Sequence, residues 1–234
     1  MNRLILFILL ILITGGMYLH GMQLYTDAEQ ENVSVHDSTY NFWLENIDSI
    51  GIPSPAFNLA LNGFYELKMK NLLNNDSLLT IIDFSKSSES RRLFILDLKN
   101  ERIVKNTLVA HGMNSGVELA QSFSNKRLSY KSSLGLFITK ETYSGKHGYS
   151  LRIDGMSVGL NDNARKRAIV IHGADYVSES FIQKNGRIGR SFGCPALPIN
   201  QTKEIIELIK NGTCLYIYHP ILIPISQADL EKLP

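Results

Sequence analysis

The sequence lacks the basic stripe that nucleic-acid-binding proteins usually carry. Its 24 lysine and arginine residues are balanced by 22 aspartate and glutamate residues, the net charge is +2, and no basic run exceeds three residues. Such binders concentrate positive charge on one face or helix, so we expect no nucleic acid among the partners. Hydrophobic residues make up 44% of the chain and charged residues 20%, which is ordinary for a globular protein and excludes a disordered one.

Cysteine is scarce, and closely spaced metal-ligand pairs are absent. The chain has two cysteines, Cys194 and Cys214, and neither a C-x-x-C nor an H-x-x-x-H pair. An alternative is a zinc site built from Cys194 with His111, His147 and His172. Zinc sites usually show close pairs, so this spacing disfavours the alternative, and we expect no metal and no cofactor.

The two cysteines could in principle form a disulfide, because exported proteins often contain them. Cys214 lies in an apolar run with the alternation of a core strand, and a bridge would consume Cys194. We therefore expect both thiols to be free.

Only one long apolar run occurs, at residues 4–13, behind Arg3, with further apolar residues up to position 19. A positive residue before a short apolar run is typical of a secretory signal, whereas a full membrane span needs about 20 apolar residues. We expect residues 1–22 to be a signal peptide or, as the alternative, an N-terminal anchor through residues 4–19. Either one places the protein outside the cytoplasm, in the periplasm or cell envelope.

The next segment, residues 23–77, reads as a linker and a helical segment. Residues 23–38 are polar without a clear period, whereas residues 39–75 carry apolar positions at helical spacing. Pro53 and Pro55 divide this stretch into two helices. The sequence leaves open whether they pack on the following domain or cover a cleft.

Residues 78–220 are dominated by short β-type runs, at 78–84, 93–98, 102–109, 134–139, 151–153, 168–171 and 213–218. Lys99 and Asn100 indicate a tight hairpin between two of them. One late helix is expected at 198–210, with Asn200 as its N-cap and residues 211–212 as its stop. The pattern predicts a mainly β domain with a sandwiched or closed sheet, followed by a C-terminal tail at 221–234.

Two motifs in this domain carry nucleophilic chemistry. A buried strand ends in His172-Gly173, and 22 residues after His172 a glycine-rich turn presents Cys194. A thiol with an ordinary pKa near 8.5 is mostly protonated at neutral pH, and an adjacent imidazole can accept its proton. Glycines in the turn, including Gly193, allow backbone amides to point at the developing oxyanion. Either residue alone is more commonly structural, but together they favour a catalytic pair.

These residues resemble the YkuD-type L,D-transpeptidase family, which has a strand ending in His-Gly and a Ser-x-Gly-Cys turn. The matching elements here are residues 169–173 and 191–194, and the similarity extends over about 78–218. It is strongest to a divergent branch of murein L,D-transpeptidase catalytic domains, through runs at 92–98, 109–112, 143–150 and 189–196. The resemblance implies an L,D-transpeptidase-like β-sandwich or barrel and a cysteine acyltransferase acting on peptidoglycan stem peptides.

The same resemblance assigns roles to individual residues. Cys194 is the expected nucleophile and His172 its base, and the Gly173 carbonyl orients the imidazole. The Gly193 and Cys194 amides, with that of Phe192 as a further donor, form the expected oxyanion site. Expected substrate-binding residues are Ser191, Phe192, Arg190 and His147. The acceptor of the acyl group stays open: an amine of another stem peptide, a protein lysine, or water, which would make the enzyme a carboxypeptidase.

Two departures from the family pattern stand out. Many members have a second histidine at the position of Phe192, and many have an arginine where this chain has Ala196. A guanidinium suits a carboxylate, so another arginine has to replace it. Arg190, in the turn itself, is the first candidate, followed by Arg187, Arg165 and Arg167.

Other families fit the motifs less well. In papain-like and NlpC-type enzymes the cysteine precedes the histidine, whereas here the histidine comes first. Sortases need an arginine after the cysteine, and the last arginine of this chain is Arg190, which precedes Cys194. The non-enzymatic alternative is a catalytically silent wall-binding module of the same fold. Loss of His172 or Cys194 would signal that alternative, and both are present.

Overall fold

The computed structural model describes residues 41–43 and 45–222. The chain divides into two compact units, residues 1–46 and residues 47–234. In the described residues of the first unit the chain is helical, and everything below concerns the second unit. The predicted signal or anchor at 1–22 and residues 223–234 of the predicted tail lie outside the described residues. Within residues 41–43 and 45–222, no helix is long and apolar enough to cross a membrane.

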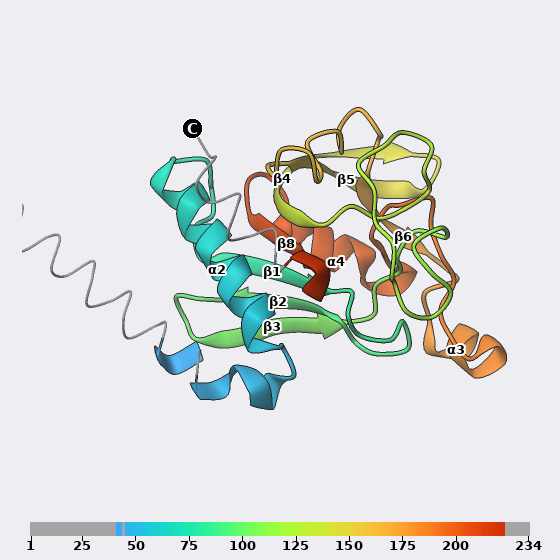
Figure 1. Ribbon diagram of the computed structural model, residues 1–234, viewed down its shortest axis with the longest axis horizontal. Coiled ribbons are helices and arrows are strands. Elements are labelled where there is room, and N and C mark those ends of the chain that lie inside the picture. The colour runs from blue at the N-terminus through green and yellow to red at the C-terminus, as the bar shows by residue number, and fades with distance from the viewer. Residues whose placement is uncertain (1–40, 44, 223–234) are drawn as a thin grey trace, which may run out of the picture. The chain divides into compact units, whose positions relative to one another are not determined.

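The second unit is built on one mixed sheet of eight strands, in the order β3-β2-β1-β8-β4-β5-β6-β7 (Figure 1). All pairs are antiparallel except β1 with β8 and β6 with β7. The strands are β1 (Leu78–Asp83), β2 (Leu93–Asp97), β3 (Arg102–Thr107), β4 (Gly135–Gly145), β5 (Gly148–Gly155), β6 (Val170–Ala174), β7 (Ala196–Pro198) and β8 (Cys214–Tyr218).

The centre of the sheet is covered on both faces, because every residue of β1, β2 and β8 is buried. Their sequences are near-continuous apolar runs, which is the pattern expected of strands without a solvent face. Helix α2 (Ser54–Met69) packs on β1 and β8 (Figure 1). The approach is close, because a Cβ at Gly63 would lie 2.8 Å from the Leu136 side chain of β4. Helix α2 of this segment therefore packs on the sheet, an arrangement that the sequence had left open.

The two edges of the sheet are joined by the chain that leaves β3. Ala110 forms an antiparallel bridge with Ala196 of β7, through a 2.8 Å hydrogen bond from the Ala110 N–H to the Ala196 carbonyl. Strands at opposite ends of the sheet order are thus brought together, which confirms the prediction of a mainly β domain of the sandwich or barrel type.

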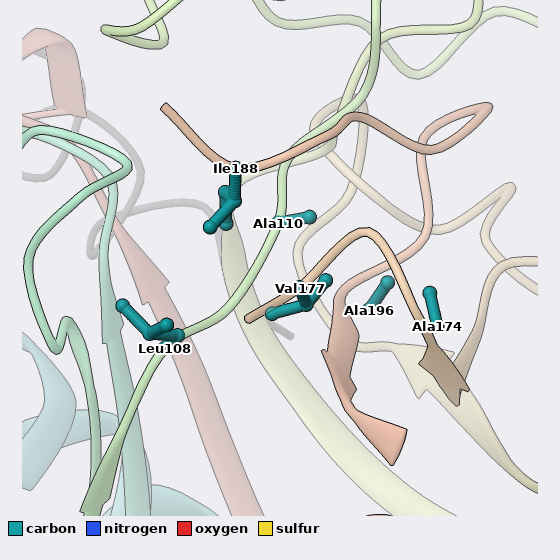
Figure 2. Packing of buried hydrophobic residues seen from close by; sticks show 6 residues of the cluster. All are labelled: Leu108, Ala110, Ala174, Val177, Ile188 and Ala196. Atoms are coloured by element: carbon teal, nitrogen blue, oxygen red, sulfur yellow. The ribbon is translucent and has the colours of Figure 1, made fainter. Parts of the chain in front are cut away.

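A small apolar cluster lies where the chain after β3 meets β7. It consists of Leu108, Ala110, Ala174, Val177, Ile188 and Ala196 (Figure 2). Three of its members are alanines, whose small side chains let the backbones approach closely. The three alanines lie next to the two motifs or to His111: Ala110 precedes His111, Ala174 follows Gly173, and Ala196 follows the cysteine turn. The cluster therefore fixes the relative positions of these segments.

Two late helices are present where the sequence predicted one. Helix α4 (Ile199–Ile209) begins directly after Pro198, so the prediction of Asn200 as the N-cap is wrong. Its end agrees with the prediction, since residues 211 and 212 both have positive φ. Helix α3 (Glu179–Asn185) was not predicted, because none of its residues is buried and it shows no apolar period. It lies at the periphery of the molecule (Figure 1).

Two strand features also went beyond the sequence prediction. The β4–β5 hairpin extends past residues 134–139 and 151–153 through an exposed half that is largely polar, so apolar runs did not reveal it. Strand β7 has only three residues. The hairpin between β2 and β3 at Lys99 and Asn100 is present as predicted.

Candidate functional site

The turn that carries Cys194 is held together by the Ser191 side chain. The Ser191 hydroxyl accepts the Gly193 N–H at 3.0 Å and donates to the Cys194 carbonyl at 2.6 Å. Gly193 has a φ of +118°, and a Cβ there would lie 2.8 Å from the Lys131 carbonyl oxygen, so only glycine fits without strain. Ser191 is buried and supports the turn from inside.

The turn is also tied to the segment that closes the sheet. The Ser191 N–H donates to the His111 carbonyl at 3.0 Å, and the Met113 N–H donates to the Ser191 carbonyl at 2.7 Å. Gly189, at the entrance, has no positive φ, but a Cβ there would lie 2.5 Å from the Tyr176 side chain. Its glycine is needed for close packing rather than for an unusual backbone conformation.

His172 lies in the middle of β6, between β5 and β7, and not at the end of the strand as the sequence predicted, because pairing with β7 extends β6 to Ala174. Its backbone pairs with Ser150 on one side and Ala196 on the other, and the side chain is buried. The His172 Nδ1 lies 2.9 Å from the Gly173 carbonyl oxygen. With the Nδ1–H donating to that oxygen, Nε2 is the nitrogen free to accept a proton.

The turn with Cys194 runs into β7 beside the strand that carries His172. His172 pairs with Ala196 in the parallel register, and the His172 N–H donates to the Pro195 carbonyl at 3.4 Å. The Cys194 Sγ accepts the Val170 N–H at 3.5 Å and lies 3.8 Å from the Ala168 carbonyl. Among the described residues no hydrogen bond joins Sγ to His172, as is common before substrate tightens such contacts.

Both side chains are held in their neutral forms. Burial raises the pKa of the Cys194 thiol, an effect that the Val170 N–H and the charge of Arg167 partly offset. Burial lowers the pKa of His172, against the opposing hydrogen bond to the Gly173 carbonyl. The resting pair is therefore a thiol and a neutral imidazole rather than a thiolate and an imidazolium.

Arg167 supports the turn that carries Cys194. Its Nη1 donates to the Ser124 carbonyl at 2.5 Å and to the Ser133 hydroxyl, and its Nη2 donates to the Lys131 carbonyl at 2.6 Å. The same Nη2 would lie 3.4 Å from a Cβ at Gly193. One guanidinium thus joins the loop at 122–131 to the cysteine turn.

The tip of the β4–β5 hairpin reaches His172. Gly145 pairs with Gly148, which leaves Lys146 and His147 as a two-residue tip. The rings of His147 and His172 stack with their centroids 4.4 Å apart and an interplanar angle of 24°. The structure therefore brings His147 onto the candidate base, whereas in the sequence only its flanking glycines suggested a place in the cleft.

The other predicted binding residues have different surroundings. Phe192 is 63% exposed, and its ring centroid lies 4.9 Å from that of Tyr130. The two aromatic rings therefore pack against each other at the surface of the turn. Arg190 is not free: its Nη1 donates to the Met113 carbonyl at 3.0 Å and to the Gly116 carbonyl at 2.9 Å. Its guanidinium holds the 113–116 loop.

His111, which the zinc alternative grouped with Cys194, makes buried structural contacts. The Arg92 Nη2 lies 2.8 Å from the His111 Nδ1, and the Nε2 lies 3.3 Å from the Gly116 carbonyl. Burial and the charge of Arg92 lower the pKa of His111 to about 4. His111 is therefore neutral, with Nδ1 accepting from Arg92 and Nε2–H donating to the loop.

We expect this histidine to make the protein sensitive to acid. In the unfolded chain the pKa of His111 is 6.5, whereas in the folded protein it is about 4. The unfolded state therefore binds the proton first as pH drops, and the free energy of unfolding falls between these two pH values. The loss is about 3 kcal/mol. Urea unfolding at pH 7 and pH 4 will measure it, with the non-titrating His111→Gln as control. Equal pH dependence in the two proteins would contradict the assignment.

The zinc alternative receives no support from the geometry. Within the described ranges, no group of three or more histidine, cysteine, aspartate or glutamate side chains gathers in a way that could hold a metal ion. Cys194 and Cys214 are both free thiols, and Cys214 is buried in β8.

Comparison with known proteins agrees with this arrangement. The sequence profile of the L,D-transpeptidase catalytic domain, a family of the YkuD type, matches residues 49–218. The chain belongs to this L,D-transpeptidase family. The match includes α2 as well as the sheet, and it contains both His172 and Cys194. No curated protein matches the chain.

Solved structures of L,D-transpeptidases are similar at low identity. An L,D-transpeptidase from Mycobacterium smegmatis shares 10% identity with a TM-score of 0.37, covering 61% of this chain and 59% of that one. Mycobacterium tuberculosis L,D-transpeptidase 1 shares 10% identity with a TM-score of 0.34, covering 60% and 61%. The helical cell shape determining protein Pgp2 from Campylobacter jejuni shares 14% identity with a TM-score of 0.40, covering 77% and 64%. The chain thus spans about six tenths of the length of the two mycobacterial structures.

Proposed function

We propose that this L,D-transpeptidase family member is an extracytoplasmic cysteine acyltransferase that acts on peptidoglycan stem peptides. The observation that supports this most directly is that the cysteine turn meets the strand of the histidine. The His172 N–H donates to the Pro195 carbonyl at 3.4 Å, the Cys194 Sγ accepts the Val170 N–H at 3.5 Å, and the Gly173 carbonyl orients the imidazole. A base and a thiol on adjacent segments are the minimum needed for thiol acylation.

In the proposed reaction the Cys194 sulfur attacks a stem-peptide carbonyl while the His172 Nε2 takes the thiol proton. The tetrahedral intermediate collapses to a thioester, and the same proton passes to the departing amine of the terminal D-amino acid. An amine of a second stem, or water, then attacks the thioester and restores the thiol. The first acceptor gives a cross-link and the second a shortened stem.

The oxyanion of that intermediate needs N–H donors, and the turn offers the amide of Cys194 itself. The Gly193 N–H, which the sequence suggested for this role, donates to the Ser191 hydroxyl at 3.0 Å. The Cys194 N–H has no hydrogen-bond acceptor among the described residues. We therefore assign the main oxyanion contact to Cys194, while Gly193 gives the turn its conformation.

Acylation of Cys194 is the decisive test. An L,D-transpeptidase has been solved in complex with imipenem, and we expect imipenem to acylate this protein too. Ring opening by the thiol adds the whole inhibitor mass without a leaving group, so intact-mass spectrometry should show one adduct per chain. We expect the adduct to be absent from Cys194→Ala and present in Cys214→Ala, the control for the buried thiol.

The alternative is a catalytically silent wall-binding module. A reduced, folded wild type that binds purified peptidoglycan but gains no mass with imipenem, and leaves tetrapeptide muropeptides unchanged, would favour the module and overturn the enzyme proposal. Release of the terminal D-amino acid from the muropeptides, or formation of a dimer, would distinguish the carboxypeptidase from the transpeptidase.

A further inference from the structure

The proposed acyl donor ends in a carboxylate, and enzymes usually meet such a group with a cation. The family arginine after the cysteine is replaced here by Ala196. Two of the candidate replacements are occupied. Arg190 donates to the Met113 and Gly116 carbonyls, and Arg187 donates to the Ile188 carbonyl at 2.9 Å.

The other two arginines are occupied more fully. Arg165 binds Asp154 and Glu141, each at 2.6 Å. Arg167 donates to two carbonyls and two hydroxyls of the 122–133 segment. Recruiting either of these two guanidiniums to a substrate would break several existing contacts, and all four arginines already serve at least one contact within the protein.

Lys146 is the cation that the fold places beside the candidate pair. It adjoins His147, whose ring stacks on His172 at 4.4 Å, so the hairpin tip lies over the base. The side chain is exposed, and within the described part of the chain it makes no ion pair or side-chain hydrogen bond. Its charge acts on both members of the pair, lowering the pKa of Cys194 and of His172.

Contacts of the β4 and β5 side chains fix the position of the hairpin. The Tyr149 hydroxyl donates to Glu207 of α4, and the Arg152 guanidinium lies 4.4 Å from the centroid of the Tyr143 ring. The stem is thus attached to the domain and the tip is attached to His172. A lysine at such a tip combines a fixed backbone with a flexible four-carbon side chain.

We propose that Lys146 binds the terminal carboxylate of the acyl donor and selects peptides that end in a free acid. This assignment rests on the proposed acyltransferase function and names the substrate group that the same site recognises. An ammonium beside the thiol draws the carboxylate toward the tip and sets the preceding peptide bond near Cys194. A donor blocked as a C-terminal amide loses this contact.

The test compares two synthetic tetrapeptide donors, one with a free C-terminal carboxylate and one with a C-terminal amide. For the wild type we expect kcat/KM on the acid to exceed that on the amide by about tenfold to a hundredfold, as befits a charge-assisted contact. In Lys146→Gln we expect kcat/KM on the acid to fall by that factor, mainly through KM, and the amide to be nearly unaffected. Lys146→Arg should keep the preference.

Lys203→Gln is the matched control, because Lys203 is an exposed lysine on α4. It should behave as the wild type. If Lys146→Gln keeps the full preference for the acid, or if the wild type shows none, Lys146 is not the carboxylate-binding residue, while acylation of Cys194 by imipenem still stands on its own. If the wild type forms no imipenem adduct and turns over neither donor, the proposed function fails and this assignment fails with it.

Discussion

Replacing His172 with glutamine is expected to slow acylation of Cys194 at pH 7 by about a hundredfold to ten-thousandfold, the usual contribution of a positioned general base. Burial raises the pKa of the thiol above its ordinary value, so very little thiolate exists near neutral pH without a base. Glutamine keeps the approximate size of the side chain but cannot accept the thiol proton. The measurement is the rate of imipenem adduct formation by intact mass.

The pH dependence separates this role from simple damage to the site. His172 acts as a base only when neutral, and its pKa lies below the ordinary 6.5 because of burial. The wild-type acylation rate should therefore stay high down to pH 6.5 and fall only below it. In His172→Gln the rate should instead rise about tenfold per pH unit up to the pKa of the thiol. His219→Gln, a histidine beyond β8, should follow the wild type, and equal profiles for all three proteins would contradict the role of His172.

The candidate pair could be recognised in the sequence because each motif is local. A buried strand that carries His-Gly and a Ser-x-Gly-Cys turn each occupy a few consecutive residues, and much of the backbone conformation follows from those residues. The core strands could also be predicted, since β1, β2 and β8 are near-continuous apolar runs that are buried along their whole length. Short or exposed elements such as α3 and β7 lack that signal.

The surroundings of the pair could not be predicted in the same way. The acceptors of Arg190 are carbonyls 74 and 77 residues earlier in the chain, and nothing in the turn indicates that the guanidinium is used there. The stacking of His147 on His172 depends on how far the β4–β5 hairpin extends, which its polar outer half conceals. Lys146 had no signal of its own, since it looks like any lysine in a turn.

Arg92 is the structural residue that the sequence analysis missed. It stands at the start of an apolar strand and is fully buried. Its guanidinium donates to the Val109 carbonyl twice at 3.0 Å, to the Lys86 carbonyl at 2.8 Å and to the His111 Nδ1 at 2.8 Å. It also lies 4.9 Å from the centroid of the Phe84 ring. One side chain thus satisfies the polar groups of two segments beneath the cysteine turn.

We expect Arg92→Met to lower the free energy of unfolding by about 3–5 kcal/mol. Methionine fills part of the space, but it leaves three buried acceptors without a donor, and each such group costs about 1–3 kcal/mol. Urea unfolding at pH 7 gives the value. Arg91→Met is the matched control, because its neighbour Glu179 lies at 3.9 Å with both side chains about two thirds exposed, and such surface pairs contribute about 1 kcal/mol at most.

We expect the structural effect of Arg92→Met to extend to the turn that carries Cys194. The Ser191 N–H donates to the His111 carbonyl, so a shift of His111 after removal of Arg92 moves the backbone that presents Cys194. We expect Arg92→Met to acylate with imipenem more slowly than the wild type even where it is still folded, and Arg91→Met to acylate normally. If Arg92→Met were as stable as Arg91→Met, the buried guanidinium would not be what holds the two segments together.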